Sequence, residues 1–392
     1  MRKDWEYKKL GEVCTIERGG SPRPITDFIT NDSNGINWIK IGDTKEGSKY
    51  ITSTKEKIKP EGVKKSRFVH KGDFILSNSM SFGRPYILDI DGCIHDGWLV
   101  IHDGKKFFSK DYLYYLLASP IMYSRFSQLA VGGVVNNLNS ALVRKVIVPI
   151  PPISIQLSIA NELDKLNEMI RLKKQQLEDY DQLAQSIFYE MFGDPVENEK
   201  GWEVKNIESV CSSIVRGPFG SALKKDFFVP KNNSTYKIYE QKNAIQKNAS
   251  IGSYYITEER FKELSRFELL PGDIIMSCSG TIGELYRIPV NAEKGIMNQA
   301  LLKFSLLKQI NFLYFLYLMD YVKKEFTIRG SGLQNIGSVK IIKSMKFGLP
   351  PLPLQQQFAA RIEAIERQKQ QVSETIKDLE TLLASRMQYW FD

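Results

Sequence analysis

Two stretches of the chain carry mostly apolar side chains at alternating intervals of four and three residues. A period of 3.5 residues is typical of left-handed coiled coils, because it keeps one stripe of each helix against a partner. The first stripe consists of Ile159, Leu163, Leu166, Ile170, Lys173, Leu177, Tyr180, Ala184, Ile187 and Met191. The second consists of Phe358, Ile362, Ile365, Lys369, Val372, Ile376, Leu379, Leu383, Arg386 and Trp390.

Each of these predicted helices follows a block of a different character. Short apolar runs, Phe74–Leu76 and Val146–Ile150 among them, lie between Gly-Asp, Gly-Gly and Pro segments, which predicts short strands and turns. Residues 112–117 and 312–319 are apolar over a longer span and predict buried helices. The predicted fold class is α+β, with two similar mixed α/β domains separated by two long helices. The predicted segments are a first domain (1–153), a helix (154–192), a linker (193–201), a second domain (202–352) and a second helix (353–392).

The two halves of the chain repeat the same framework. An offset of 197 to 202 residues relates the matching segments, so one unit of block plus helix is duplicated. The matches pair Trp5–Cys14 with Trp202–Cys211, Gly72–Ser77 with Gly272–Ser277, and Ile150–Gln156 with Leu349–Gln355. In this alignment His95-Asp96 falls opposite Met297-Asn298, so a His-Asp pair is predicted in one half only.

The linker between the halves predicts the direction of the helix pair. A seam of about 33 residues spans roughly 50 Å at a rise of ~1.5 Å per residue. The linker 193–201 reaches at most ~30 Å at ~3.3 Å per residue. Because it cannot run back along the whole coil, the helices are predicted to pair antiparallel, with one domain at each end and a pseudo-twofold axis between the halves. The charged seam residues Lys173, Lys369 and Arg386 are expected to fix the register or to extend to the edge of the seam.

Charge is concentrated in the two blocks. The chain of 392 residues carries a net charge of +9 with 42% hydrophobic residues, which is typical of folded protein. Residues 1–153 contain 23 basic and 16 acidic residues (net +7), and residues 201–352 contain 21 and 13 (net +8). Basic blocks of this kind favour a polyanionic partner, nucleic acid first, although ordinary solubility charge is an alternative.

Export, membrane and metal functions find little support in the sequence. No apolar run approaches the ~20 residues of a bilayer-spanning helix, and the first residues lack an export signal, so a cytoplasmic location is predicted. The four cysteines and three histidines are scattered singly, which disfavours a zinc site or a disulfide framework.

Motifs for catalysis are also weak. The sequence lacks an Asp/Asn-Pro-Pro-Tyr methyltransferase motif and a Gly-x4-Gly-Lys-Ser/Thr nucleotide-binding loop. Asp194 followed by Glu203-Val204-Lys205 resembles a nuclease motif, but Glu6-Tyr7-Lys8 in the repeat has no acidic residue upstream. A stand-alone metal-dependent nuclease therefore remains one alternative, and a coiled-coil scaffold that binds no nucleic acid remains another.

The duplicated order of motifs resembles the specificity (S) subunits of type I DNA restriction-modification enzymes. The resemblance covers the whole chain. It includes a Pro-Pro-x-x-x-Gln type motif before each long helix (Ile150–Gln156 and Leu349–Gln355), the segment Met191–Pro195 followed by Asn198, and Lys200–Trp202. It implies two target recognition domains that read a bipartite double-stranded DNA target. Because the segments between the shared motifs differ, the target is expected to be asymmetric.

The resemblance also implies partners and cofactors. The long helices would act as a spacer and dock modification (methyltransferase) subunits, two in number, which in turn bring restriction subunits. Methylation and cleavage would be performed by those chains, so this chain is expected to be a non-catalytic subunit without a cofactor or metal of its own and without a membrane partner. S-adenosylmethionine, ATP and Mg²⁺ are expected on the partner subunits. Apolar residues off the seam could meet a partner or cover the domains; these are Leu172, Leu183, Phe188, Leu382, Met387 and Tyr389.

The residues expected to contact DNA are basic or amide side chains in the loops, since Arg and Lys bind phosphates and Arg, Asn and Gln bind base edges. In the first domain they are Arg18, Ser21, Arg23, Lys64, Lys65, Arg67, Asn136 and Asn137. In the second they are Arg216, Ser221, Lys224, Lys225, Gln241, Lys242, Asn243, Arg329, Gln334 and Asn335. For each basic residue a solvated surface charge is the alternative, and the three asparagines after the glycines, at positions 136, 137 and 335, could instead be turn residues.

Overall fold

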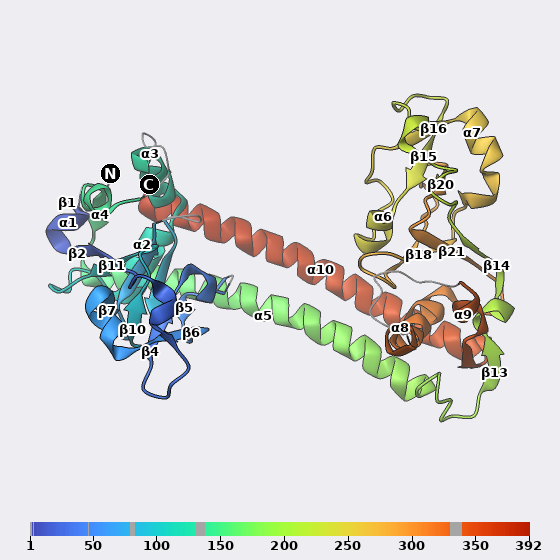
Figure 1. Cartoon of the computed structure of the whole chain (residues 1–392), viewed down its shortest axis with the longest axis horizontal. Coiled ribbons are helices and arrows are strands. Elements are labelled where there is room, and N and C mark those ends of the chain that lie inside the picture. Colours follow the sequence, from blue (N-terminus) through green and yellow to red (C-terminus); the bar gives the residue numbers. More distant parts are fainter. Residues whose placement is uncertain (1, 3, 46, 79–82, 131–137, 330–338) are drawn as a thin grey trace. The chain divides into compact units, whose positions relative to one another are not determined.

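The computed structural model describes the chain except for residues 1, 3, 46, 79–82, 131–137 and 330–338. It divides into two compact units, Met1–Gln175 with Ser373–Asp392 and Gln176–Val372. The helices α5 (Ile153–Phe192) and α10 (Leu352–Phe391) each contribute one half to each unit. The prediction of a mixed α/β protein with two long helices is confirmed (Figure 1).

Within each unit the two helix halves run in opposite directions. As residue numbers rise along α5, those of the contacting residues fall along α10. The contacts pair Glu162 with Arg386 and Lys174 with Glu380 in the first unit, and Asp181 with Lys369 and Phe188 with Phe358 in the second. All the seam residues predicted from the 3.5-residue period are buried or half-buried. Coiled-coil periodicity therefore located the helix faces that pack.

Two off-seam residues behave differently from the rest of their set. Phe188 is fully buried, with its ring 5.6 Å from that of Tyr314 and 5.2 Å from that of Tyr321. It joins α5 to α8 (Phe312–Arg329) instead of facing a partner. Met387 is half-buried against the core of the first unit. The other members of the set, Leu172, Leu183, Leu382 and Tyr389, are exposed.

The first unit contains two five-stranded sheets and a two-stranded sheet. One sheet has the order β3-β6-β4-β10-β7 and the other has the order β2-β11-β8-β9-β5. The first consists of β3 (Ile29–Thr30), β6 (Glu56–Ile58), β4 (Ile36–Ile39), β10 (Gly92–Ile94) and β7 (Arg67–Val69). The second consists of β2 (Thr15–Arg18), β11 (Trp98–His102), β8 (Phe74–Ser77), β9 (Pro85–Leu88) and β5 (Tyr50–Ile51). Strand β1 (Glu6–Lys9) pairs with β12 (Ile147–Ile150), which joins the two ends of the block before α5 begins.

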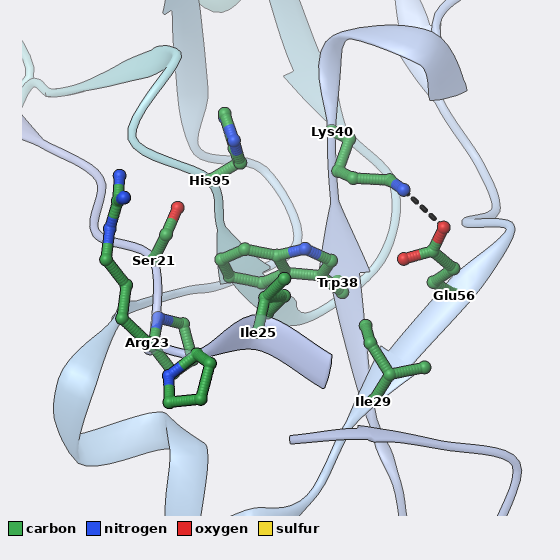
Figure 2. A pocket seen from close by; sticks show the side chains of 10 residues that line it. Ser21, Arg23, Ile25, Ile29, Trp38, Lys40, Glu56 and His95 are labelled. Carbon is green, nitrogen blue, oxygen red and sulfur yellow. Dashed lines mark hydrogen bonds and ion pairs between the residues drawn. The ribbon is translucent and has the colours of Figure 1, made fainter. Parts of the chain in front are cut away.

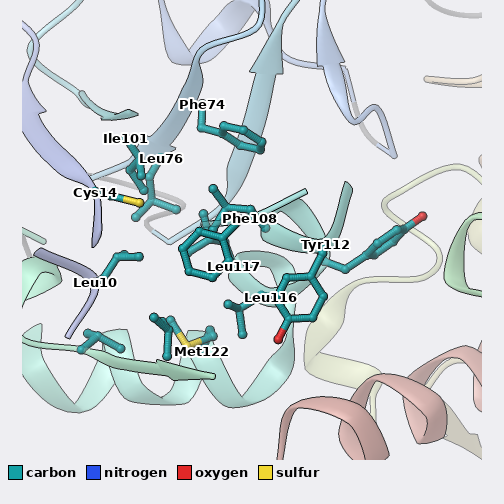
Figure 3. Packing of buried hydrophobic residues seen from close by; sticks show 14 of the residues in the cluster. Leu10, Cys14, Phe74, Leu76, Ile101, Phe108, Tyr112, Leu116, Leu117 and Met122 are labelled. Atoms are coloured by element: carbon teal, nitrogen blue, oxygen red, sulfur yellow. The ribbon is translucent and has the colours of Figure 1, made fainter. Parts of the chain in front are cut away.

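Hydrophobic packing connects these sheets to the helices. Helices α1 (Leu10–Val13), α2 (Lys110–Ala118), α3 (Pro120–Ala130) and α4 (Ser140–Arg144) complete the unit. Figure 3 shows Leu10 and Cys14 in one cluster of buried side chains with Phe74 and Leu76 of β8 and Tyr112 of α2. The same cluster includes Phe391 from the end of α10, whose ring is 5.7 Å from that of Tyr112.

The second unit repeats this arrangement with two sheets of four strands each. Their orders are β14-β21-β18-β19 and β16-β15-β20-β17, and β13 (Glu203–Asn206) pairs with β22 (Lys346–Leu349). The strands are β14 (Cys211–Arg216), β21 (Leu301–Leu306), β18 (Ile274–Ser277), β19 (Leu285–Arg287), β16 (Tyr255–Thr257), β15 (Thr235–Tyr239), β20 (Gly295–Met297) and β17 (Glu268–Leu269). The helices besides α8 are α6 (Gln241–Ile245), α7 (Glu258–Glu263) and α9 (Val339–Ser344).

The repeated motifs are parts of the framework. Gly72 and Gly272 have φ angles of +94° and +92°, which glycine adopts without strain, and the carboxylate of the following aspartate accepts a backbone N–H three residues upstream. The residues Gln156 and Gln355 are at most 1% exposed. The Oε1 atom of each accepts a backbone N–H at 2.8 Å, and its Nε2 atom donates to a proline carbonyl. These motifs hold the start of each long helix against its own block.

Candidate nucleic-acid interface

The two halves share a corner formed by an arginine and a glycine. Strands β2 and β14 end at Arg18 and Arg216. The Nε atom of Arg18 donates to the backbone carbonyl of Asp96 at 3.0 Å, and that of Arg216 donates to the carbonyl of Gln299 at 3.2 Å. Each guanidinium is therefore anchored by the main chain of the loop that precedes β11 or β21.

The glycine of each corner permits a close approach of two chain segments. A Cβ atom at Gly19 would lie 2.3 Å from the carbonyl oxygen of His95, and one at Gly217 would lie 1.8 Å from that of Asn298. The backbone N–H of each glycine donates to the start of the neighbouring strand, at 2.9 Å and 3.0 Å. Because no side chain fits there, glycine is the residue that the corner requires.

This geometry corrects the alignment of the halves near His95. The sequence comparison placed His95-Asp96 opposite Met297-Asn298, whereas the structure pairs it with Asn298-Gln299. The Nδ1 atom of His95 accepts the N–H of Gly97 at 2.9 Å, and the Oδ1 atom of Asn298 accepts the N–H of Ala300 at 3.0 Å. The two side chains perform the same turn-forming role, so His95 has a structural counterpart that is not a histidine.

Next to the corner of the first unit lies an open pocket of about 680 Å³. Figure 2 shows Trp38 at its centre, Ser21 and Arg23 to one side, and the ion pair of Lys40 and Glu56 to the other. The Trp38 ring is almost fully buried and lies edge-on to His95 at 5.9 Å between ring centroids. The pocket thus combines an apolar floor with cationic and hydroxyl groups at its rim.

Neighbouring charges and hydrogen bonds set the protonation states of Asp96 and His95. Desolvation raises the pKa of Asp96, but the Ser21 hydroxyl, which donates at 2.8 Å, and the nearby His95 and Arg18 outweigh it and lower the pKa overall. Burial lowers the pKa of His95, and Arg23 and Arg18 act in the same direction against Asp96. At neutral pH His95, which lines the pocket, is therefore neutral, and the adjacent Asp96 is anionic.

The remaining cations expected in the first unit border this region. Lys64 and Lys65 are exposed at the end of a 3₁₀ turn, Pro60–Lys65, and the Lys65 ammonium lies 4.8 Å from the centre of the Phe28 ring. Arg67 donates to the carbonyl of Arg18 at 2.9 Å and pairs with Glu17 at 2.8 Å. Arg67 therefore supports the backbone at Arg18, and its guanidinium already has an anionic partner within the protein. Arg23 is 82% exposed and lies 3.8 Å from Asp96.

In the second unit the corner is followed by a cationic loop. Ser221, Lys224 and Lys225 are exposed. Gln241 accepts a hydrogen bond of 2.9 Å from the Ser279 hydroxyl, and Lys242 pairs with Glu240 at 2.6 Å. These two side chains thus have partners within the unit but keep partial exposure.

Asn243 is not a surface residue of this loop. Its side chain is fully buried. The Oδ1 atom accepts the Glu240 N–H at 2.8 Å, and the Nδ2 atom donates at 2.9 Å to the carbonyls of Asn248 and Ile251. Both amide N–H donors and the amide oxygen are bonded inside the loop, so we assign it a structural role. Asn136, Asn137, Gln334, Asn335 and the side chain of Arg329 lie outside the described residues.

Three residues at this interface were missed by sequence reasoning. Asp96 and Gln299 occupy equivalent positions beside the arginines, and an Asp-to-Gln change between repeats gives no sequence signal of that equivalence. Phe219 is 87% exposed in the loop after Gly217. Its neighbours Pro218, Ala222 and Leu223 are apolar as well, so only its exposure in the structure distinguishes it.

The nuclease-like segment has a structural explanation. The Oδ1 atom of Asp194 accepts the backbone N–H groups of Val196 at 2.8 Å and Glu197 at 3.2 Å, which closes the turn after α5. Lys205 pairs with Glu203 on the same strand.

Within the described part of the chain, no three His, Cys, Asp or Glu side chains are grouped as metal ligands, and no helix has the length and apolarity to cross a bilayer. The four cysteines are free, and burial raises the pKa of Cys14 and Cys211 to about 12.

The two blocks share an arginine corner, differ in the loops around it and are each followed by a long helix. A profile of the type I restriction modification DNA specificity domain matches residues 2–179 and 199–381. The chain therefore belongs to this family and contains two of its domains.

Full-length relatives agree with this assignment. The type I restriction enzyme MjaIX specificity subunit of Methanocaldococcus jannaschii is 24% identical over 93% of this chain and 87% of its own length. The putative MjaX specificity subunit of the same organism is also 24% identical, over 97% and 92%. A solved chain from work on complex assembly and conformational transition of the type I R-M system superimposes with a TM-score of 0.70 at 18% identity, over 99% of this chain and 97% of that one, which shows a shared fold.

Proposed function

We propose that the chain reads an asymmetric bipartite sequence in duplex DNA as the specificity subunit of a type I restriction-modification enzyme. Residues 1–153 and 202–352 are the proposed target recognition domains. The single observation that carries the proposal is the duplicated Arg-Gly corner, in which the same main-chain anchor holds Arg18 and Arg216 while the flanking residues differ. Two domains that hold an arginine in the same way but differ in the residues beside it are suited to read two different base sequences.

Phosphate contacts in this proposal come from exposed lysines near each corner. Lys64 and Lys65 serve the first half of the target, and Lys224 and Lys225 serve the second. Their charge gives affinity without sequence information, because neutralised phosphates release counterions whatever the base. Ser21, Arg23, Ser221, Gln241 and Lys242 are the proposed neighbours for base or phosphate contact, with Gln299 added and Asn243 removed on structural grounds.

The long helices are proposed to bind modification subunits. Leu172, Leu183, Leu382 and Tyr389 are between 46% and 56% exposed on α5 and α10, which supports a protein partner over these faces. Catalysis, S-adenosylmethionine, ATP and Mg²⁺ are assigned to the partner chains, and two modification subunits are proposed. In this proposal the chain acts by positioning those subunits on DNA.

The test compares two charge-reversal variants in the complete complex. The chain is assembled with its modification subunits, and the target is defined by mapping methylated adenines in cells with and without the chain. Lys64→Glu combined with Lys225→Glu is expected to weaken binding to that duplex at least tenfold and to reduce the salt slope by about 2, one unit per lost phosphate contact. The matched control is Lys105→Glu with Lys308→Glu, two exposed lysines beyond the far ends of β11 and β21.

Each alternative predicts a different result. Equal losses in both variants would indicate only a general effect of net charge, and unchanged binding of the first variant would refute the assigned interface. Cleavage of DNA by the purified chain with Mg²⁺ alone would instead support a nuclease. Absence of methylation changes and of duplex binding by the assembled complex would support a scaffold.

A further inference from the structure

Phe219 is exposed to a degree that is unusual for an aromatic residue. Its side chain is 87% exposed, whereas the other exposed aromatic residues in the described part of the chain reach at most 56%. Val290 is the comparable aliphatic residue, at 89%. An aromatic ring exposed to water lacks the favourable free energy that burial would give it. Its exposure therefore requires a structural cause or a binding partner.

The backbone around Phe219 holds the ring outward. Gly217 is packed against Asn298 so closely that no side chain fits, and Pro218 is buried. The N–H of Ala222 donates to the carbonyl of Phe219 at 2.8 Å, which closes a turn directly after the ring. The ring therefore projects from a chain segment that is fixed on both sides.

The surroundings of the ring favour nucleic acid over a membrane or an apolar protein surface. A Cβ atom at Gly220 would lie 3.2 Å from the side-chain oxygen of Gln299, so this exposed amide lies beside the same turn. Arg216 precedes the loop, and Lys224 and Lys225 follow it, all within ten residues of the chain. A ring flanked by cations and an amide matches the faces of bases between phosphates.

The first unit has a different residue at the corresponding place. Counted from the shared Arg-Gly, Ser21 occupies the position of Phe219, and its hydroxyl donates to Asp96 at 2.8 Å. Asp96 in turn occupies the position of Gln299. The first corner thus uses a hydroxyl-carboxylate pair where the second presents a ring and an amide.

We propose that Phe219 inserts against a base step in the second half of the DNA target and stacks on or wedges between bases. The inference rests on the proposed function and assigns one residue of it. Apolar side chains that enter a base step partly unstack it, and a base stacked on an aromatic ring adds affinity with little dependence on base identity. Phe219 would therefore favour deformable steps at its position, while Gln299 and Arg216 supply hydrogen bonds.

The experiment selects random-sequence duplexes with the full chain assembled with its modification subunits. Phe219→Ala is expected to bind the wild-type consensus roughly 5- to 100-fold more weakly, to lose preference at one base step of one half-site, and to leave the other half-site unchanged. Phe219→Trp is expected to retain binding. Val290→Ala, which removes an equally exposed apolar side chain, is the matched control and is expected to behave as wild type. 2-Aminopurine placed at the affected step should brighten on binding wild type but not Phe219→Ala.

The outcomes separate this inference from the proposed function. If the wild-type complex selects no consensus, the proposed function itself fails. If Phe219→Ala selects the wild-type consensus with affinity within twofold, the ring does not contact bases and the inference is overturned. Loss of assembly with the modification subunits in Phe219→Ala would likewise overturn it, because the ring would then bind protein.

Discussion

The guanidinium of Arg18 is held by the backbone carbonyl of Asp96, which accepts its Nε–H at 3.0 Å. Arg216 repeats this contact with Gln299 at 3.2 Å. A carbonyl is present whatever the side chain, so residues 96 and 299 can differ without moving the arginine. The duplicated domains can thus keep the position of one arginine while the residues beside it differ.

We predict that lysine cannot replace either arginine. Arg18→Lys and Arg216→Lys keep the charge but lose the planar group that bonds a carbonyl and can bond a guanine edge bidentately. Each is expected to lower affinity at least fivefold, the low end of about 1–3 kcal/mol for a lost bidentate contact, and to relax specificity in one half-site only. Selection from random duplexes measures both effects. Relaxation of the same half-site by both variants would contradict the assignment of one corner to each half.

A second prediction concerns the glycine of the corner. Gly217→Ala places a Cβ atom 1.8 Å from the Asn298 carbonyl, so β14 and the loop before β21 must separate. A loss of about 1–3 kcal/mol in the free energy of unfolding is expected from such overpacking. Gly42→Ala is the control, because no atom lies within 4 Å of its added Cβ. Urea denaturation of the full chain measures both, and equal midpoints would show that the corner relaxes freely.

The buried glutamine before each long helix gives a third prediction. Gln156→Ala removes the acceptor of the Ser109 N–H and the donor to the Pro151 and Phe107 carbonyls, in a site 1% exposed. Three groups that lose their partner should cost about 3–6 kcal/mol, at about 1–2 kcal/mol each. Gln185→Ala, on the exposed face of the same helix, should change stability by less than about 0.5 kcal/mol. A comparable effect of both variants in thermal unfolding would contradict the structural role of Gln156.

The sequence was sufficient for the helices, the repeat and the class of fold. The seam residues recur at a fixed period, and burial follows that period because neighbouring turns of a helix share one face. The apolar runs at Phe74–Leu76 and Val146–Ile150 form strands β8 and β12, as predicted. The segments predicted as buried helices, 112–117 and 312–319, lie in α2 and α8.

The loops were less predictable, for a physical reason in each case. Met297 was aligned with His95 because loop lengths differ between the halves, and the contacts of the arginine and glycine in each corner show the true equivalence. Asn243 carries an amide of the kind that binds base edges. Such an amide can nevertheless be buried when main-chain groups form its hydrogen bonds. The role of Asp96 depends on groups distant in sequence, which no local pattern encodes.

The ion pair between the long helices in the first unit gives the last prediction. Glu162 accepts bonds from Arg386, with Nη2 to Oε2 at 3.0 Å, and from Trp390 at 3.0 Å. The hydrogen bond from Arg386 lowers the pKa of Glu162; desolvation opposes it, and the Trp390 bond assists it. A folded-state pKa below the unfolded value of ~4.3 means that the pair stabilises fully above about pH 5 and loses its effect as pH falls through the folded pKa.

Glu162→Gln should therefore lower the melting temperature near neutral pH and have a progressively smaller effect toward pH 3. Both side chains are about one-third exposed, so the effect at pH 7 should correspond to about 1 kcal/mol or less. Melting curves of wild type and variant between pH 7 and 3 measure the difference at each pH, which cancels the acid sensitivity of all other carboxylates. Arg386 stays protonated throughout, so the loss must come from Glu162. A difference that is independent of pH would show that the bonds to Glu162, and not its charge, stabilise the helix pair.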